Sequence, residues 1–316
     1  MRIGIIGIGV MGEYHTRVYS EIAATNPDIH LVGIADINKA HVEALAKKYG
    51  TKAYDDYNQL LDSHLDAISI CVPTSMHAEV AIKAIQKGIR GILVEKPISD
   101  NLNDANDIVK FARDKGVVLT VGHVERYNPA VLLLKNILDS DRLGHIVSIS
   151  AKRVGIRPPR IKDTGVIIDL AVHELDIIPY LFGAIPIDVC ALAGEGDNGL
   201  EDWASIILRF SEQRAGIIET NWLTPRRIRT LDITGMKAVA HLDYIDQTVT
   251  ISENEMEEEI KFTKQEPLRK ELQHFINVVR GNETPLVTGE DGIKALKLAL
   301  AAVESYKTGS VIKVDI

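Results

Sequence analysis

The chain has 316 residues, a length that predicts roughly two domains at about 150 residues each. Lysine and arginine total 36 and aspartate and glutamate total 44, so the formal net charge is −8. This balance argues against a protein that holds nucleic acid or anionic lipid by bulk charge. Hydrophobic residues make up 46% and charged residues 25%, which excludes a collagen, a coiled coil or a wholly disordered chain.

The two cysteines, Cys71 and Cys190, lie within apolar runs, which favours free thiols in a reducing compartment. No stretch reaches the roughly 18 apolar residues of a membrane span. The apolar N-terminus contains three glycines and soon meets Glu13 and Arg17, so it predicts a buried strand rather than a signal peptide. We therefore expect a cytoplasmic protein with no membrane or nucleic-acid partner. Since no H-x-x-x-H or C-x-x-C spacing occurs, we expect no metal.

Residues 1–122 alternate short apolar runs with amphipathic stretches. The runs are typical of parallel strands covered on both faces, and they are Arg2–Ile8, His30–Ala35, Ala67–Val72, Gly91–Val94 and Val117–Val121. Helical patterns lie between them at Ala40–Tyr49, Ala78–Gly88 and Leu102–Lys115. The alternation predicts an α/β domain built on a doubly wound parallel sheet.

Residues 123–316 have a different pattern. Helices are predicted over Pro129–Leu138, Asp169 to about Phe182, Leu268–Arg280 and Asp291–Tyr306. Strands are predicted at Ile146–Arg153, Asp188–Ala193, Trp203–Phe210, Ala215–Trp222, Ile228–Ile233, Ala238–Leu242 and Thr248–Ile251. Short runs in series with little helix between them indicate a mostly antiparallel sheet, hence an α+β second domain. The Glu-rich stretch Glu253–Glu259 is interpreted as a solvated hairpin.

A glycine-rich turn follows the first predicted strand. Gly7 permits the tight turn, Gly9 lets the backbone approach a pyrophosphate, and Gly12 lets the next helix pack close to the strand. Val10 and Met11 open that helix beside the expected phosphates. The motif at this position predicts a dinucleotide cofactor.

Asp36 ends the second strand, 24 residues after Gly12. A carboxylate about 20 residues beyond the motif hydrogen-bonds the adenosine ribose in dinucleotide-binding folds. Because a carboxylate repels a 2′-phosphate, the residue predicts NAD rather than NADP. The alternative is that Asp36 only caps the next helix.

The end of the third long apolar run has candidate cofactor-binding residues. Val72, Pro73, Thr74 and His77 follow the third long apolar run, at the sheet edge where ligands bind, and are interpreted as cofactor contacts. Ser75 is alternatively just a helix cap.

The next strand ends in Glu95 and Lys96, which are also expected to contact the cofactor. Lys96 is expected where a substrate hydroxyl meets the nicotinamide. The alternative for Glu95 and Lys96 is a surface ion pair.

Asp169, His173 and Asp176 are spaced four and three residues apart, on one face of a helix with apolar flanks. Neutral imidazole accepts a proton near neutral pH, so His173 is a candidate general base and Asp169 its partner. The alternative is a core histidine with satisfied hydrogen bonds.

These motifs, in this order, resemble the Gfo/Idh/MocA oxidoreductases over essentially the whole chain. The resemblance implies a Rossmann domain, an open-faced sheet domain that makes homodimers or homotetramers, and catalytic roles for Lys96, Asp169 and His173. Segments 122–129 and 153–160 look most like members that oxidise the C3 hydroxyl of UDP-N-acetylglucosamine. In place of the Gly-Gly-Gly run that many relatives carry before Asp169, this chain has Thr164-Gly165-Val166-Ile167.

A nucleotide-sugar substrate also agrees with the arginine content of two loops, because arginine forks suit a diphosphate. The residues expected at the substrate, besides Asp169 and His173, are Arg126, Tyr127, Asn128, Arg153, Arg157, Arg160 and Trp222. A solvated or inter-subunit basic patch is the alternative for the arginines, and core packing is the alternative for Trp222. The rival functions are oxidation of a free polyol, such as inositol or glucose, and NAD sensing without catalysis.

Overall fold

The computed structural model describes residues 1–157, 164–196 and 199–315, which form two compact units. The first unit comprises residues 1–124 and 266–293, and the second comprises residues 125–265 and 294–316. Within the described residues, no helix has the length and apolar character needed to cross a membrane.

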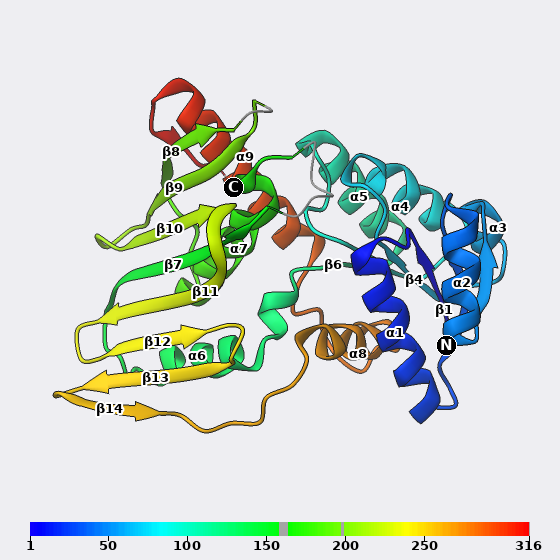
Figure 1. Ribbon diagram of the computed structural model, residues 1–316, viewed down its shortest axis with the longest axis horizontal. Coiled ribbons are helices and arrows are strands. Elements are labelled where there is room, and N and C mark those ends of the chain that lie inside the picture. Colours follow the sequence, from blue (N-terminus) through cyan, green and yellow to red (C-terminus); the bar gives the residue numbers. More distant parts are fainter. Residues whose placement is uncertain (158–163, 197–198, 316) are drawn as a thin grey trace. The chain divides into compact units, whose positions relative to one another are not determined.

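The first unit is built on a six-stranded parallel sheet with helices on both faces (Figure 1). In sheet order the strands are β3 (Lys52–Tyr54), β2 (His30–Ala35), β1 (Arg2–Ile6), β4 (Ala67–Ile70), β5 (Gly91–Val94) and β6 (Val118–Val121). The helices are α1 (Val10–Thr25), α2 (Lys39–Tyr49), α3 (Tyr57–Leu61), α4 (His77–Gln86), α5 (Leu102–Lys115) and α8 (Pro267–Val279). The order reverses between β1 and β4, and ligands of such sheets bind at this switch point.

The second unit is built on a nine-stranded mixed sheet in which, among the described residues, β7 and β10 pair in parallel and the other neighbours are antiparallel. In sheet order the strands are β14 (Met256–Glu259), β13 (Thr248–Glu253), β12 (Val239–Asp243), β11 (Leu223–Gly235), β7 (Ile146–Ile156), β10 (Ala215–Asn221), β9 (Glu201–Arg209), β8 (Asp188–Glu195) and β15 (Ile312–Lys313). The helices are α6 (Pro129–Asp139), α7 (Val172–Phe182) and α9 (Gly289–Thr308), the last of which begins in the first unit. The α/β and α+β fold classes expected from the sequence are confirmed.

Helices cover one face of this sheet. Residues of α6, α7 and α9 pack with alternate residues of the strands in one apolar core, and the other strand residues face outward. Full burial of each leucine or isoleucine in such a core stabilises the fold by about 1.5–3 kcal/mol. No described helix of this unit packs in a core on its second face, so this face is open within the described residues, as the resemblance implied.

The compact units differ from the expected domains, 1–122 and 123–316, in a boundary that lies at residue 124 and in one later segment. Residues 266–293 belong to the first unit although they follow most of the second in sequence. The reason is the apolar face of α8, since Leu268, Leu272 and Phe275 pack into the same core as Ile3 and Ile5. Helical periodicity predicted this helix but could not show which core it would join.

Candidate functional site

The turn between β1 and α1 gives three glycines three different surroundings. Gly7 has a φ of +87°, and a Cβ there would lie 2.5 Å from the Val72 nitrogen. A Cβ on Gly12 would lie 1.9 Å from the Gly7 oxygen, so helix and strand pack too closely for a side chain. A Cβ on Gly9 would meet nothing within 4 Å. The residues therefore fit a dinucleotide, with a rigid turn at Gly7 and Gly12 and an open approach for phosphate at Gly9.

Asp36 ties the end of β2 to this turn. Its Oδ2 accepts the Ile8 N–H at 2.7 Å and its Oδ1 accepts the Asn38 N–H at 2.8 Å. The cap of α2 is Asn38, whose Oδ1 accepts the His41 N–H at 3.2 Å. Asp36 is therefore not the helix cap that the sequence left as an alternative. Its carboxylate, held beside the glycine turn, fits the ribose-binding position.

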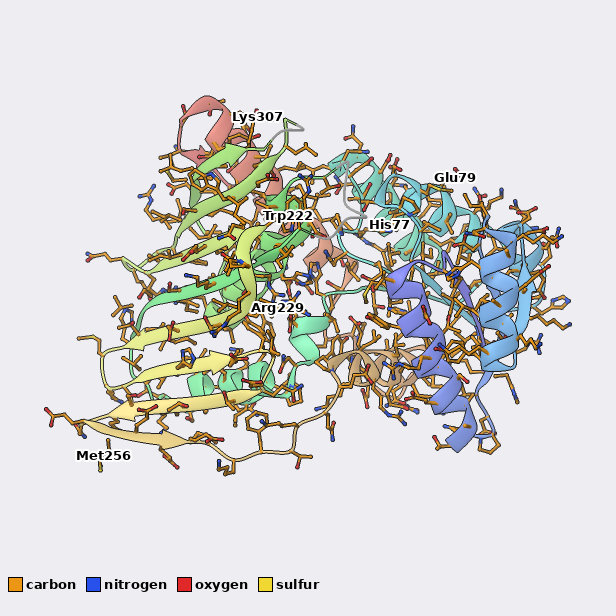
Figure 2. The ribbon with its side chains drawn as sticks, in the orientation of Figure 1. His77, Glu79, Trp222, Arg229, Met256 and Lys307 are labelled. Carbon is orange, nitrogen blue, oxygen red and sulfur yellow. The ribbon has the colours of Figure 1, made fainter. Side chains whose placement is uncertain are left out.

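The segment after β4 separates into two groups of residues. Pro73 is exposed and Val72 and Thr74 are half-buried, whereas His77, at the start of α4, is buried (Figure 2). The His77 Nδ1 lies 2.9 Å from the Pro97 carbonyl oxygen, and its Nε2 lies 3.0 Å from that of Val72. Burial lowers the pKa of His77, although both carbonyls favour the protonated ring. This histidine therefore holds two loops together, and the structure does not expose it to a cofactor as the sequence suggested.

Glu95 is buried next to Lys96 and bonds to the helix of the glycine motif. The His15 Nε2, one turn after Gly12, lies 3.0 Å from Glu95 Oε1, and Glu95 Oε2 accepts the Lys96 backbone N–H at 3.2 Å. A Cβ on Gly122 would lie 3.0 Å from the Glu95 carboxylate. His15 and Lys96 lower the pKa of Glu95 despite its burial. Glu95 thus links α1 to the half-buried Lys96 and is not a surface partner of that lysine.

His15 and Glu95, together with the Cys71 thiol, place potential metal-ligand atoms within 4.8 Å of one another. The spacing of the sequence did not reveal this group, because His15 lies on α1, Cys71 follows β4 and Glu95 follows β5. Burial beside Glu95 and Glu271 raises the pKa of Cys71 well above its usual value. The thiol is therefore protonated at neutral pH and is a weak nucleophile.

In the second unit, Asp169 and His173 lie on one continuous helical segment. Asp169 is in a π-helical turn, Ile167–Ala171, that runs directly into α7, and His173 is the second residue of α7. Both side chains are half-buried. π-Helical turns occur frequently at functional sites because they re-aim neighbouring side chains. The structure therefore gives the two candidate residues a shared, partly exposed helix.

Arg126 and Asp176 pair inside the second unit. The guanidinium donates from Nε to both Asp176 oxygens, at 3.1 and 2.9 Å, and from Nη2 at 2.6 Å. It also stacks 4.8 Å from the centre of the Tyr180 ring. This corrects the expected substrate contact, because the planar fork of Arg126 is buried against α7. Asp176, predicted on the face of Asp169, is the partner.

Arg153 is also buried, with a side chain 0% exposed. Its Nε donates to Glu174 Oε1 at 2.5 Å and its Nη2 to Glu125 Oε1 at 2.9 Å. Tyr244 donates its hydroxyl to Glu174 Oε2 at 2.9 Å. The expectation that Arg153 binds a diphosphate is therefore at odds with the structure, which encloses this arginine between two carboxylates.

Asn128 and Tyr127 are likewise buried. The Asn128 Oδ1 accepts the Ala130 N–H at the start of α6, and its Nδ2 donates to Glu125 and to the Tyr244 carbonyl. Asn128 is a helix cap and also belongs to the buried network of Arg153, Glu125, Glu174 and Tyr244. This corrects its expected place at the substrate.

Arg157 and Trp222 form the remaining described pair. The guanidinium lies 4.9 Å from the indole centre and pairs with Asp202 at 3.2 Å, and its side chain is 27% exposed. Trp222, between β10 and β11, is buried (Figure 2). Arg160 lies outside the described residues. Arg157 is therefore the described loop arginine whose side chain stays partly exposed, and its expected contact with the substrate remains a prediction.

Sequence reasoning missed two residues that this geometry singles out. His15 was absent from the candidates, although its position three residues after Gly12 places it on the face of α1 that packs on the sheet. Arg229, on β11, is the second. Its signal was the cluster Arg226, Arg227 and Arg229 beside Trp222 in an acidic protein.

The parallel sheet with its glycine turn and aligned carboxylate defines a dinucleotide-binding domain. Comparison with known proteins identifies the family. Two family models match, an oxidoreductase NAD-binding Rossmann fold over residues 1–123 and the C-terminal alpha/beta domain of the same family over residues 135–315. The chain belongs to the Gfo/Idh/MocA oxidoreductase family. Its cofactor is NAD.

Similar proteins act on sugars and on cyclic polyols. UDP-N-acetylglucosamine 3-dehydrogenase of Acidithiobacillus ferrooxidans is 27% identical over 97% of this chain and 98% of its own. Its solved structure has a TM-score of 0.88 and covers 98% of each chain. The NAD(+)-dependent scyllo-inositol 2-dehydrogenase of Bacillus subtilis is 28% identical over 100% of this chain and 97% of its own. The protein is thus an NAD-dependent oxidoreductase of a family that acts on the CH–OH groups of sugars and polyols.

Proposed function

We propose that this protein oxidises a secondary alcohol of a UDP-sugar to a ketone with NAD, the C3 hydroxyl of UDP-N-acetylglucosamine being the favoured position. The observation that supports a nucleotide sugar is the half-exposed Arg157, which stacks on Trp222 in a protein of net charge −8. The similar dehydrogenase of A. ferrooxidans supports the particular substrate. Scyllo-inositol 2-dehydrogenase is equally similar, so a free polyol is the second candidate.

The cofactor is held in this proposal by the first unit. Gly7, Gly9 and Gly12, with the adjoining Val10 and Met11, bind the pyrophosphate by backbone N–H groups at the start of α1. Asp36 binds the adenosine ribose, and its negative charge disfavours the 2′-phosphate of NADP. When bound, NAD accepts a hydride from the alcohol carbon.

The proton is handled by side chains of the chain itself. His173 accepts the hydroxyl proton, and Asp169 orients its imidazole or the substrate. Lys96 donates a hydrogen bond to the same hydroxyl oxygen and stabilises the negative charge that develops there. Glu95 holds the backbone of Lys96 through the N–H at 3.2 Å, and His15 in turn fixes Glu95.

The test of the substrate is a spectrophotometric screen at 340 nm with NAD and a panel of UDP-sugars, inositols and glucose. We expect NADH to form fastest with UDP-N-acetylglucosamine and UDP to inhibit competitively against that substrate. Each assay is repeated with 2-oxoglutarate, and there the ketone product is measured by mass spectrometry. An enzyme that keeps its NADH bound turns over only when a 2-oxo acid takes the hydride, and no NADH then accumulates at 340 nm. Rapid oxidation of an inositol, with no inhibition by UDP, would replace the proposal with the polyol function.

The roles of the residues have their own test. His173→Ala should lower kcat by at least about 10²-fold while the Kd of NAD changes little, because general base catalysis contributes about 10²–10⁴-fold. Asp36→Ser should reduce the preference for NAD over NADP, since it removes the repelling carboxylate. A His173→Ala enzyme with full turnover would exclude this residue as the base.

A further inference from the structure

Arg229 is a mostly buried cation on the helix-covered face of the second sheet. Leu231 and Ile233 follow Arg229 (labelled in Figure 2) at alternate positions of β11 and so lie on the same face. They are 0% exposed, whereas the Arg229 side chain is 24% exposed. On the helix-covered face of β11, the buried apolar residues therefore give way to Arg229, which solvent and solutes can reach.

The register of the sheet places a second positive charge beside it. Arg229 is directly opposite Arg153 in the antiparallel pair of β11 and β7. Directly opposite side chains have Cβ atoms only about 4.5–5.5 Å apart, and like charges in such a pair destabilise the sheet. Two arginines at this position thus need negative partners.

The carboxylates of the network are already engaged by Arg153. Glu174 and Glu125 accept its Nε and Nη2, and Arg229 Nη1 lies 3.6 Å from the same Glu125 oxygen that Arg153 uses. Within the described residues, the Arg229 guanidinium makes this ion pair, and its side-chain N–H groups donate no hydrogen bond. Burial and the Arg153 charge lower the pKa of Arg229 to about 9, which leaves it charged at neutral pH. A poorly compensated guanidinium costs stability unless an anion joins it.

The backbone next to Arg229 is irregular in a way that suits a ligand site. The pairing of β11 with β7 shifts register between Leu223 and Ile228, so extra residues bulge out before Ile228, the residue that precedes Arg229. Bulges of this kind re-aim side chains and are frequent beside active sites.

We propose that Arg229 is the substrate-anion anchor of the second unit and binds the diphosphate of the nucleotide sugar. This inference rests on the proposed function and deepens it, because it assigns the diphosphate to an arginine that has unused donors. Arg126 and Arg153 have their forks enclosed by carboxylates, whereas Arg229 offers planar N–H pairs that match phosphate oxygens. Arg153 and Arg229 share one Glu125 oxygen, and the bound diphosphate supplies the further negative charge that Arg229 needs.

A purely structural role and an anion-binding role of Arg229 predict different effects of its removal on the Tm. If the ion pair with Glu125 were its purpose, removal of Arg229 would lower the Tm of the protein without ligand. If Arg229 serves an anion, its removal relieves the repulsion from Arg153, and the Tm stays the same or rises. Binding residues commonly carry such a cost in stability.

The experiment measures UDP binding by calorimetry to the full-length protein saturated with NAD, which blocks binding of UDP in the dinucleotide site. The variants are Arg229→Gln, Arg229→Lys and the control Arg226→Gln, which removes the same charge from an exposed position of β11. We expect Arg229→Gln to weaken UDP about 10- to 100-fold, the effect of lost hydrogen bonds to a charged group. Arg229→Lys should be intermediate, and Arg226→Gln should bind like the unsubstituted protein.

Each remaining outcome decides between the two proposals. Equal UDP affinity of the Arg229→Gln and unsubstituted proteins would overturn the anchor and leave the proposed function standing. A lower Tm for Arg229→Gln without ligand would also overturn it, because the residue would then be a structural partner of Glu125. If the unsubstituted protein neither binds UDP nor oxidises a UDP-sugar, the proposed function fails, and the anchor fails with it.

Discussion

Gly9 and Gly12 are three residues apart, and the space around them separates ligand binding from packing. A Cβ at position 9 meets nothing within 4 Å, whereas a Cβ at position 12 would lie 1.9 Å from the Gly7 oxygen. We expect Gly12→Ala to lower the free energy of unfolding by about 1–3 kcal/mol, the usual cost of overpacking. Urea unfolding of the protein without cofactor measures this.

Gly9→Ala should weaken NAD binding and leave the free energy of unfolding unchanged. Its stability without cofactor should match that of the unsubstituted protein, because the new methyl group has room. Its affinity for NAD should fall at least tenfold, about 1.4 kcal/mol, since the methyl group occupies the approach of the pyrophosphate. Fluorescence titration with NADH gives the Kd, and unchanged NADH binding would refute the assigned role of Gly9.

His77 makes stability depend on pH in a defined window. Burial lowers its pKa below the usual value of about 6.5, so the unfolded chain binds a proton that the folded chain does not. The contribution of His77 is therefore complete above pH 6.5 and is lost as the pH falls towards the lowered pKa. For one group the slope is at most about 1.4 kcal/mol per pH unit.

The measurement is a series of urea unfolding curves between pH 5 and pH 8. His77→Gln should flatten the pH dependence over this range, although the variant is less stable overall. His30→Gln, at an exposed position of β2, is the control and should keep the original slope. Parallel curves for all three proteins would contradict the assigned role.

At the residue scale, the sequence predicted the geometry of the glycine turn and not the surroundings of the arginines. The three glycine roles follow from local backbone sterics, and nearby residues suffice to predict them. The burial of Arg126 and Arg153 depends on Asp176 and Glu174, which approach from α7. Arginines in a polar loop normally face water, so only the tertiary structure shows that these two do not.

Helix α7 is fixed to the sheet by charge as well as by apolar packing. Glu174, adjacent to His173, is 0% exposed and accepts the Arg153 Nε at 2.5 Å and the Tyr244 hydroxyl at 2.9 Å. Removal of one partner of a buried pair costs roughly 3–5 kcal/mol, because the other charge remains buried. We therefore expect Glu174→Gln to lower the free energy of unfolding by about this amount.

The matched control is Asp114→Asn, which breaks the exposed ion pair with Lys110 on α5. Exposed pairs contribute little, so this variant should unfold almost like the unsubstituted protein. Urea unfolding compares the two, and a similar small effect of both substitutions would show that the network around Glu174 is not needed for stability. In variants that fold, kcat should fall more than KM rises if Glu174 also positions His173.

Most elements were predictable because their periodicity is local. The β2, β5 and α5 segments appear where the apolar patterns placed them, and the Glu-rich stretch is the expected hairpin of β13 and β14 with exposed residues. The helix expected from Asp169 is a π-helical turn that continues as α7 from Val172. β3, only Lys52–Tyr54, was missed because three residues are too few to show a period. The extra residues of β11 before Ile228 were missed because a bulge interrupts alternation.

At the scale of the whole molecule, we expect the open face of the second sheet to form the interface of a homodimer or homotetramer. Ile207 of β9 and Ile217 of β10 are directly opposite each other and are 50% and 43% exposed. Trp203 and Leu192, on β9 and β8, are also exposed apolar residues. An exposed cluster of large apolar side chains on one sheet favours an interface with another protein.

We expect the double variant Ile207→Lys, Ile217→Lys to be a monomer of about 34.8 kDa, and we expect the unsubstituted protein to be a dimer or tetramer. Two lysines at the centre of an interface would have to lose their hydration without a partner, which opposes association. Multi-angle light scattering after size exclusion gives the mass. Met256→Lys, at an exposed position of the edge strand β14, is the control and should keep the oligomer. A monomeric unsubstituted protein, or an oligomer that survives both lysines, would show that this face is not the interface.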